Sequence, residues 1–403
     1  MKKSYFLNSK KYLIFFVILF IFLPWSPKGI SFEISKETIL VFEASPLPES
    51  FTKYKELKES EGFNVIRLNI NSIKESDKVE GLRGYLRENK EKLNIKYLLI
   101  IGSDKSFPMK RLYPRGSGIH DQFDSDFEAT PSDIYFVDPF EDFDKDKDGI
   151  FGEYPDDDIK LDTHIYVGRV PFDNIKTLDN YFSKLVQFER LKFNQKNYAL
   201  LIGAYLSFKG ETWYDRILEN EDGSEFMEMI IQDFLIKNGF TPIRIYEKDG
   251  SLPSFYPSDY SLKDRKISEL LKSKIFGFIN LNAHGSPYGV AGYLWEDSDK
   301  NYLFSKEETK FYSILNISDI PDDFLGGVFF ASSCLTAYPE SEINLANEYL
   351  LKGGSVYIGA TRISWGPTYW RDINDGGLLT INYLFVKNFI DKKIRVGDAF
   401  WES

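Results

Sequence analysis

One cysteine and one histidine are the residues of this sequence best suited to covalent chemistry. Cys334 is the only cysteine among 403 residues, and His284, one of three histidines, precedes it by 50 positions. A thiol near its ordinary pKa is mostly protonated at neutral pH, and an adjacent imidazole can remove that proton to generate the nucleophilic thiolate. The pair therefore predicts acyl transfer through a thioester. The alternative is a small buried cysteine and a structural histidine, the usual role of either residue alone.

Each of these residues follows an apolar run with the length and composition of a buried strand. Residues 275–281 end three positions before His284, and residues 327–331 end three positions before Cys334. In open α/β sheets, ligands bind in the crevice beyond the carboxyl ends of the strands. If the two strands are neighbours, the two side chains face each other at that edge. The backbone N–H groups of Gly285 and Cys334 would then form an oxyanion hole.

A second candidate site is the acidic segment that begins at residue 144. Aspartates alternate there with lysines and precede a glycine, which is the pattern of the first half of a calcium-binding loop. The candidate ligands are Asp144, Asp146, Asp148 and Glu153, and the acidic run 156–158 is available to complete a cage. Position twelve of an EF-hand loop would be glutamate and is proline here, so a different cage is expected. We expect a structural Ca²⁺; a solvated acidic turn is the alternative.

The amino terminus has the pattern of an export signal. Four lysines among the first eleven residues precede an apolar run, 12–23, which is shorter than the about 20 residues that a bilayer crossing needs. We expect residues 1–31 to be a signal peptide cleaved after Ser31, and the protein to be periplasmic, cell-surface or extracellular. It would meet the membrane only through this signal. An uncleaved N-terminal membrane anchor is the alternative.

Composition indicates a folded, acidic protein. Hydrophobic residues make up 43% of the chain, enough for a large core, and the formal net charge is -11. An acidic surface repels phosphate backbones, so nucleic acid is not an expected partner. One cysteine cannot form an internal disulfide, so the fold depends on its core and on any bound metal.

Short apolar runs alternate with amphipathic segments along the chain, which predicts β-α-β connections around mostly parallel sheets. Strands are expected at residues 38–42, 64–70, 97–101, 134–137, 164–168, 198–203, 242–246, 275–281, 327–331 and 355–359. Helices are expected at 51–60, 78–93, 174–192, 224–238, 261–273 and 341–352. The predicted fold is an α/β three-layer sandwich with two subdomains, 32–195 and 196–403.

Several short motifs follow one another in a specific order. They are Tyr97-Leu98-Leu99-Ile100-Ile101-Gly102-Ser103-Asp104, Ala129-Thr130-Pro131-Ser132-Asp133, Tyr166-Val167-Gly168-Arg169-Val170-Pro171, Asn282-Ala283-His284-Gly285 and Gly353-Gly354-Ser355-Val356-Tyr357-Ile358-Gly359-Ala360-Thr361-Arg362. With a cysteine about 50 residues after the histidine, this succession resembles the gingipain-like family of cysteine peptidases, which have a caspase-like fold. The likeness runs from about residue 38 to the end of the chain.

The resemblance implies a caspase-like fold and an endopeptidase in which Cys334 is the nucleophile and His284 the base. It implies an oxyanion hole made by Gly285 and Cys334. It also implies that Trp365, which follows the Gly-Ala-Thr-Arg turn, lines the pocket for the residue before the scissile bond. Proteins or peptides would be the substrates, and no organic cofactor is expected.

Two departures from the family pattern leave parts of the site unassigned. Family members often carry an acidic residue just before the strand that ends in Val-Gly-Arg, where it can orient the catalytic histidine. His164 occupies that place here, with Asp162 two residues earlier, so the third catalytic residue is open. The chain ends at Ser403, where a further strand and often accessory domains are expected, so whether the C-terminus is truncated is open.

Three functional hypotheses fit these observations. The favoured one is an exported cysteine endopeptidase that hydrolyses peptide bonds through an acyl-enzyme. A sortase-like transpeptidase of the same family would use the same acyl-enzyme, which an amine would intercept. The third, from another class, is a catalytically inactive, calcium-stabilised surface binding protein.

Overall fold

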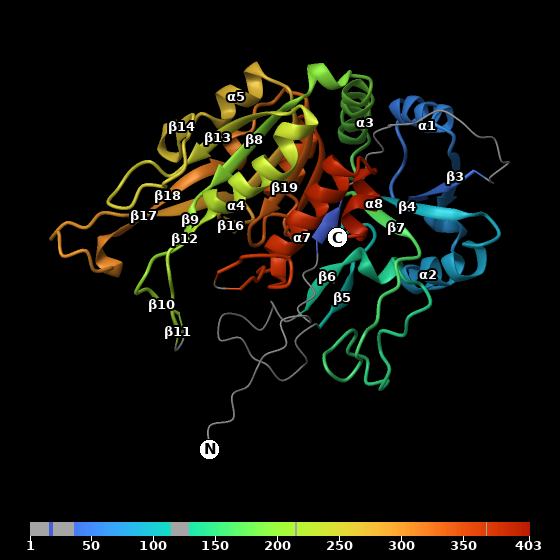
Figure 1. The fold of residues 1–403 in the computed structure, drawn as a ribbon. Coiled ribbons are helices and arrows are strands. Elements are labelled where there is room, and N and C mark those ends of the chain that lie inside the picture. Colours follow the sequence, from blue (N-terminus) through green and yellow to red (C-terminus); the bar gives the residue numbers. More distant parts are fainter. Residues whose placement is uncertain (1–15, 19–35, 114–128, 214–215, 368) are drawn as a thin grey trace.

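Two mostly parallel sheets form the framework of the computed structural model, which describes residues 16–18, 36–113, 129–213, 216–367 and 369–403 (Figure 1). The first sheet has four parallel strands in the order β3-β2-β4-β7. They are β2 (Thr38–Glu43), β3 (Asn64–Asn69), β4 (Ile95–Ile101) and β7 (Tyr166–Val170). Helices α1 (Ser50–Ser60) and α2 (Lys78–Asn89) connect three of them, as the alternating pattern predicts.

The second sheet has seven strands in the order β1-β20-β19-β15-β8-β13-β14. They are β1 (Phe16–Ile18), β8 (Tyr198–Gly203), β13 (Thr241–Tyr246), β14 (Tyr260–Ser261), β15 (Phe276–Asn282), β19 (Gly326–Ser332) and β20 (Gly354–Ala360). All neighbours are parallel except β1, which runs antiparallel to β20 at one edge. Apart from this short strand, the predicted signal peptide 1–31 lies outside the described residues.

Helices pack on both sheets and join them. Helix α3 (Ile175–Glu189) contacts α1 of the first half, and it also contacts β20 and helix α6 (Leu345–Lys352) of the second (Figure 1). Its Tyr181 hydroxyl donates a 3.0 Å hydrogen bond to the carbonyl of Ser355 in β20. The other helices are α4 (Gly223–Ile230), α5 (Ile267–Ser273), α7 (Gly377–Val386) and α8 (Val396–Trp401).

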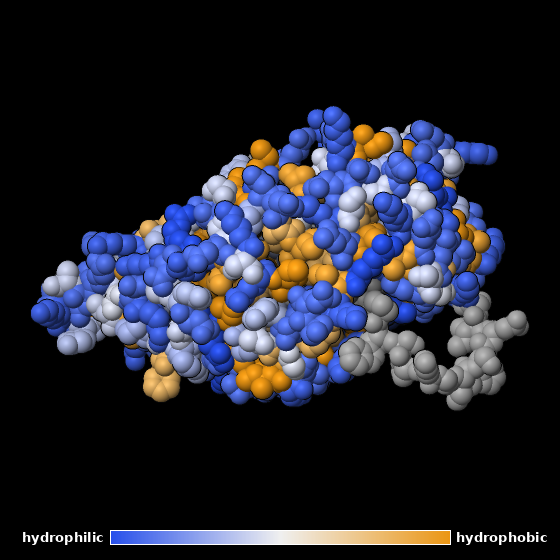
Figure 2. Space-filling model, turned by 90° about the horizontal axis from the view of Figure 1, so that it is seen from above, coloured by the Kyte–Doolittle hydropathy of each residue, from blue (hydrophilic) through white to orange (hydrophobic). Residues whose placement is uncertain are grey.

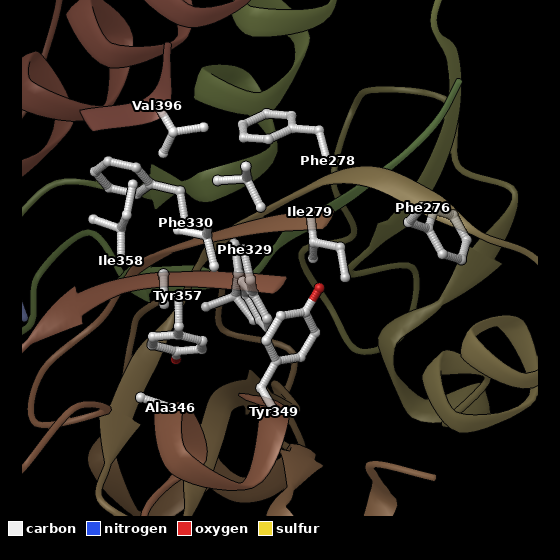
Figure 3. Close-up of a cluster of buried hydrophobic side chains, with 14 of the residues drawn as sticks. Phe276, Phe278, Ile279, Phe329, Phe330, Ala346, Tyr349, Tyr357, Ile358 and Val396 are labelled. Carbon is white, nitrogen blue, oxygen red and sulfur yellow. The ribbon is translucent and has the colours of Figure 1, made fainter. Parts of the chain in front are cut away.

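The central strands are largely apolar because both of their faces are covered. Every residue of β15 and β19 is buried, which explains why these strands read as continuous apolar runs rather than alternating ones. Figure 3 shows Phe329 of β19 beside Tyr349 of α6 on one face of the sheet, and Phe278 and Phe330 on the other face. Hydrophilic residues cover most of the face in Figure 2, with hydrophobic residues gathered near its middle.

A small antiparallel sheet extends from the carboxyl end of β15. It has the order β16-β17-β18, with β16 (His284–Ser286), β17 (Gly289–Trp295) and β18 (Thr309–Asn316). A hairpin follows β8, in which β9 (Tyr205–Ser207) pairs with β12 (Glu221–Asp222). Two further short pairs are β5 (Lys110–Leu112) with β6 (Thr130–Ser132), and β10 (Thr212–Trp213) with β11 (Arg216–Ile217).

One predicted strand, 134–137, is wrong. The segment is a 3-10 turn, Asp133–Phe136, because the hydroxyl of Ser132 accepts a hydrogen bond from the N–H of Ile134 and caps the turn. Two predicted helices begin four or more residues later than expected. Helix α5 begins at Ile267 rather than 261, after β14, and α6 begins at Leu345, where the side chain of Asn344 caps it.

The chain passes from the first sheet to the second at the position where the sequence predicts a subdomain boundary. Helix α3 ends at Glu189 and β8 begins at Tyr198. One hydrophobic cluster nevertheless contains residues of both sheets, so the halves share a core. The division into 32–195 and 196–403 stays a prediction. Among the described helices, none is long and apolar enough to cross a membrane.

Candidate active site

Cys334 and His284 follow two neighbouring strands at the same edge of the second sheet. Strands β15 and β19 pair directly, and their last paired residues are Asn282 and Ser332. His284 and Cys334 each lie two positions beyond that pair. The Ser333 hydroxyl donates a 2.7 Å hydrogen bond to the carbonyl of Ala283, and this bond joins the segments that follow β19 and β15. The structure therefore brings together the two residues that the sequence singled out.

Gly285 allows the close approach of these two segments. A Cβ atom at this position would lie 3.0 Å from the backbone nitrogen of Cys334 and 2.7 Å from the Cβ of Ser333, and closer still to the carbonyl oxygen of Cys334. Any larger residue would push the cysteine loop away from the histidine. The two backbones that the sequence predicts as an oxyanion hole, Gly285 and Cys334, are thus in contact.

A backbone carbonyl orients the imidazole of His284. The Nε2 atom lies 2.9 Å from the carbonyl oxygen of Leu206, so it carries the proton and donates it. Leu206 belongs to β9, which follows β8, and β8 flanks β15 on the side opposite β19. In the neutral ring, the Nδ1 atom is therefore the unprotonated nitrogen.

The environment keeps this imidazole neutral. Burial lowers the pKa of His284 below its ordinary value of 6.5, because the charged form loses its hydration. The hydrogen bond to Leu206 and the charge of Glu211 act in the opposite direction but do not outweigh burial. At neutral pH the ring is consequently neutral rather than an imidazolium, and one nitrogen can accept a proton.

The thiol of Cys334 is half-buried and lies against the segment that follows β20. Its Sγ atom is 3.8 Å from the Ser364 carbonyl oxygen and 3.6 Å from the Ser364 hydroxyl. The next residue along the chain from Cys334, Leu335, has a left-handed backbone with φ of 60°, held by a 3.0 Å hydrogen bond from its N–H to the Arg362 carbonyl. Trp365, the residue after Ser364, is partly buried.

The motifs of the first half support this site through a chain of contacts. The carbonyls of Pro131 and Ala129 accept hydrogen bonds of 3.1 Å from the Thr361 hydroxyl and from the Arg362 Nε atom, respectively. At the end of the same segment, the carboxylate of Asp133 forms a buried ion pair with Arg169. The segment 129–133 thus links the first sheet to the loop that holds the cysteine.

The family pattern suggests a third catalytic residue near His164 and Asp162. Both of these residues contact Asp138. His164 stacks edge-to-face on Phe140, and its Nε2 atom is 3.8 Å from Asp138. The backbone N–H of Asp162 donates to the same carboxylate. The hydrogen-bond partner of the His284 imidazole is the Leu206 carbonyl, and sequence analysis missed it because a backbone carbonyl leaves no side-chain signature.

The acidic loop brings its carboxylates into two groups that overlap at Asp146. Ligand oxygens of Asp146, Asp148 and Glu153 lie within 4.8 Å of one another, and a second group joins Asp144 and Asp146 to Asp157. Glu153 is 3% exposed, and its Oε2 atom is buried with no hydrogen-bond partner among the residues that the structure describes. Burial and the neighbouring aspartates raise the pKa of Glu153 to about 7. Asp157 was anticipated only as part of the run 156–158.

This fold and this pair of side chains define a class of protein. A thiol and an imidazole lie just past neighbouring parallel strands of an α/β three-layer sandwich, which is the arrangement of cysteine peptidases with a caspase-like fold.

The chain belongs to peptidase family C25, whose family model matches residues 34–403. The structure is similar to gingipain R (RGPB), described as an Arg-specific cysteine proteinase, with a TM-score of 0.52 and 14% identity over 91% of this chain and 76% of that one. A complex of the RgpB pro- and mature domains from Porphyromonas gingivalis matches with a TM-score of 0.51 and 14% identity, over 91% and 77%.

A third solved structure, described only as a protease, matches with a TM-score of 0.50 and 14% identity. The match covers 82% of this chain and 61% of the length of that protein. No curated protein sequence matches the chain. At this identity the structural likeness concerns the fold, and it confirms the caspase-like architecture predicted from the motifs.

Proposed function

We propose that the protein is an exported cysteine endopeptidase that cleaves peptide bonds in proteins or peptides. The observation that carries the proposal is the placement of His284 between Cys334 on one side and the Leu206 carbonyl on the other. Family membership supports the reaction class. The basic and apolar pattern of residues 1–31 supports export.

Each step uses a group already described. The Nδ1 atom of His284 takes the proton of the thiol, and Sγ of Cys334 attacks the scissile carbonyl carbon. The N–H groups of Gly285 and Cys334 stabilise the oxyanion, a contribution of about 3 kcal/mol for one such donor. The imidazolium returns its proton to the leaving amine, and water, deprotonated by the same ring, hydrolyses the thioester. In this proposal Trp365 lines the pocket for the residue before the scissile bond.

Covalent labelling of the single cysteine tests the proposal. A peptidyl acyloxymethyl ketone should modify Cys334 in the folded protein, residues 32–403, and block cleavage of a peptide library. Denatured protein treated with iodoacetamide gives the total thiol for comparison. A folded chain that neither reacts with the ketone nor cleaves the library would be an inert binding protein, and ligation to an added amine would indicate a transpeptidase.

The lowered pKa of His284 predicts the acid side of the pH–rate profile. Activity requires the neutral ring, so kcat/KM should fall only as pH drops through a value below 6.5. The same shift makes the folded state lose stability as pH falls below 6.5, because the unfolded histidine binds a proton more readily. NMR titration of the imidazole in Cys334→Ala removes any influence of the thiol. A midpoint above 6.5 would contradict the neutral-base assignment.

We also propose that the acidic loop binds Ca²⁺ as a structural ion. Carboxylate oxygens on a short turn suit this hard cation, and a cation would compensate the buried Oε2 atom of Glu153, which accepts no hydrogen bond from the described residues. Asp146 belongs to both carboxylate groups and would be the central ligand. The loop precedes β7 of the first sheet, so the ion would fix that segment rather than take part in catalysis.

Calcium should raise the thermal unfolding temperature. Binding to the folded state alone stabilises it by about 2.7 kcal/mol at a free concentration 100 times the Kd. Because Glu153 must lose its proton, the affinity should increase as pH rises through about 7. Asp146→Asn should abolish the shift between EDTA and calcium. Asp297→Asn, in the acidic group Asp297, Asp299 and Glu308, is the control and should retain it; equal unfolding temperatures with and without calcium would reject the site.

A further inference from the structure

A row of aromatic side chains leads away from the imidazole of His284. The rings of His284 and Tyr293 are 5.3 Å apart between centroids and meet edge-to-face at 78°. The rings of Tyr293 and Phe311 are also 5.3 Å apart, at 65°. Phe311 is 64% exposed, although burying a phenylalanine side chain is favourable by about 2 kcal/mol or more. The row therefore presents an apolar surface that nothing in the described chain covers fully.

The small sheet fixes these rings on one face. His284 of β16 pairs with Ala291 of β17, and Tyr293 of β17 pairs with Phe311 of β18. Paired residues, and residues two apart along a strand, point to the same side of a sheet. On the opposite face, Leu294 and Leu315 are buried, at most 2% exposed. The aromatic row is thus the outer face of a sheet anchored in the core.

The row extends to the side of the imidazole that lies away from the thiol. Cys334 follows β19, which flanks β15 on one side, and Leu206 follows β8, which flanks it on the other. Strand β17 packs against β9, the strand that contains Leu206. Tyr293 is therefore reached from Cys334 by passing the imidazole.

We propose that Tyr293 and Phe311 bind an aromatic or large aliphatic side chain among the first three residues after the scissile bond. This inference rests on the proposed function. The acyl half of the substrate becomes attached to Cys334, whereas the leaving amine receives its proton from His284. The leaving half must therefore depart across the imidazole, in the direction of the aromatic row. Aromatic partners stack on such a row with a preference of about 0.5–1.5 kcal/mol beyond simple burial.

A purely structural role of the aromatic row can be distinguished experimentally from the proposed role in substrate binding. Tyr293 touches the imidazole, so its removal could disturb catalysis with every substrate. Phe311 contacts Tyr293 and lies mostly in solvent, so Phe311→Ala should leave the fold and the catalytic pair intact. Phe255, which is 94% exposed and packs against Tyr256, offers a matched control substitution, Phe255→Ala.

The experiment compares substrates with and without residues after the cut. A peptide library is digested with the wild-type protein, Phe311→Ala and Phe255→Ala, and residue frequencies are read at the first three positions after the cleaved bond. A peptidyl coumarin amide, whose leaving group contains no amino acid, is measured in parallel.

We expect aromatic and large aliphatic residues to be enriched at one of these positions with the wild-type protein and with Phe255→Ala. Phe311→Ala should lower kcat/KM about two- to tenfold for peptides with such a residue, and should leave glycine-containing peptides and the coumarin amide unchanged. Equal profiles for wild type and Phe311→Ala, or an equal loss on the coumarin amide, would overturn the inference alone. Absence of any cleavage or of Cys334 labelling in the wild type would overturn the proposed function with it.

Discussion

Replacing His284 with alanine is expected to lower kcat/KM by about 10³-fold or more while the protein stays folded. The imidazole takes the proton of Cys334 in the first step and protonates the leaving amine in the second, so its loss affects both. The orienting partner is the carbonyl of Leu206, which is retained when the side chain changes. Leu206→Ala should therefore keep most of the activity, whereas an orienting carboxylate side chain would be sensitive to substitution.

His164→Ala and Asp162→Ala are the matched controls for this prediction. Both residues are near the place where the family pattern suggests a third catalytic residue, and the structure places them beside Asp138 instead. Their substitution should leave kcat/KM for a peptidyl coumarin amide unchanged, with circular dichroism and thermal unfolding confirming the fold of each variant. A large loss in His164→Ala with little loss in His284→Ala would reverse the assignment of the base.

The pairing of the two reactive residues could be predicted from sequence because the segment directly before each residue has the pattern of a buried strand. Each follows a continuous apolar run, and such runs mark parallel strands that are buried on both faces. The carboxyl ends of neighbouring parallel strands meet at one edge, so His284 and Cys334 had only to follow adjacent strands, as β15 and β19 are. Gly285 added a second signal, since the structure shows that a side chain there would collide with the cysteine loop.

The orientation of the imidazole could not be predicted in the same way. It depends on strand order, which places β8 on the far side of β15, and on a carbonyl of β9 that any residue at position 206 would supply. The aromatic row was hidden for a similar reason. Tyr293 and Phe311 are 18 positions apart, and only the register of β17 and β18 makes them neighbours.

The wrong strand at 134–137 shows how a polar contact overrides an apolar run. Its residues are buried, as strand residues would be, but Asp133 at its start forms an ion pair with Arg169 and Ser132 caps the following turn. A short apolar run cannot by itself distinguish a strand from a tight buried turn. The ion pair partner is 36 positions away and belongs to the Tyr-Val-Gly-Arg motif, so the two motifs are explained together.

Asp133→Ala is expected to destabilise the protein by about 3–5 kcal/mol, because it leaves a buried guanidinium without its counter-charge. Arg169 is fully buried, and its Nε and Nη2 atoms donate to the two oxygens of Asp133 at 2.7 and 2.6 Å. Its Nη1 atom donates to the carbonyls of Gly102 and Phe107, at 2.9 and 2.8 Å, but carbonyls carry no net charge to neutralise the ion. Urea unfolding monitored by tryptophan fluorescence measures the loss.

The exposed pair of Lys310 and Glu296 supplies the control, because solvent screens it. Glu296→Ala should leave the urea midpoint almost unchanged, and a similar midpoint for Asp133→Ala would show that the buried pair is not needed.

The segment 129–133 also holds Thr361 and Arg362, and the Arg362 carbonyl holds the residue after Cys334. Asp133→Ala should therefore lower kcat at temperatures where the variant is still folded, since the loosened segment no longer fixes the loop that positions the thiol.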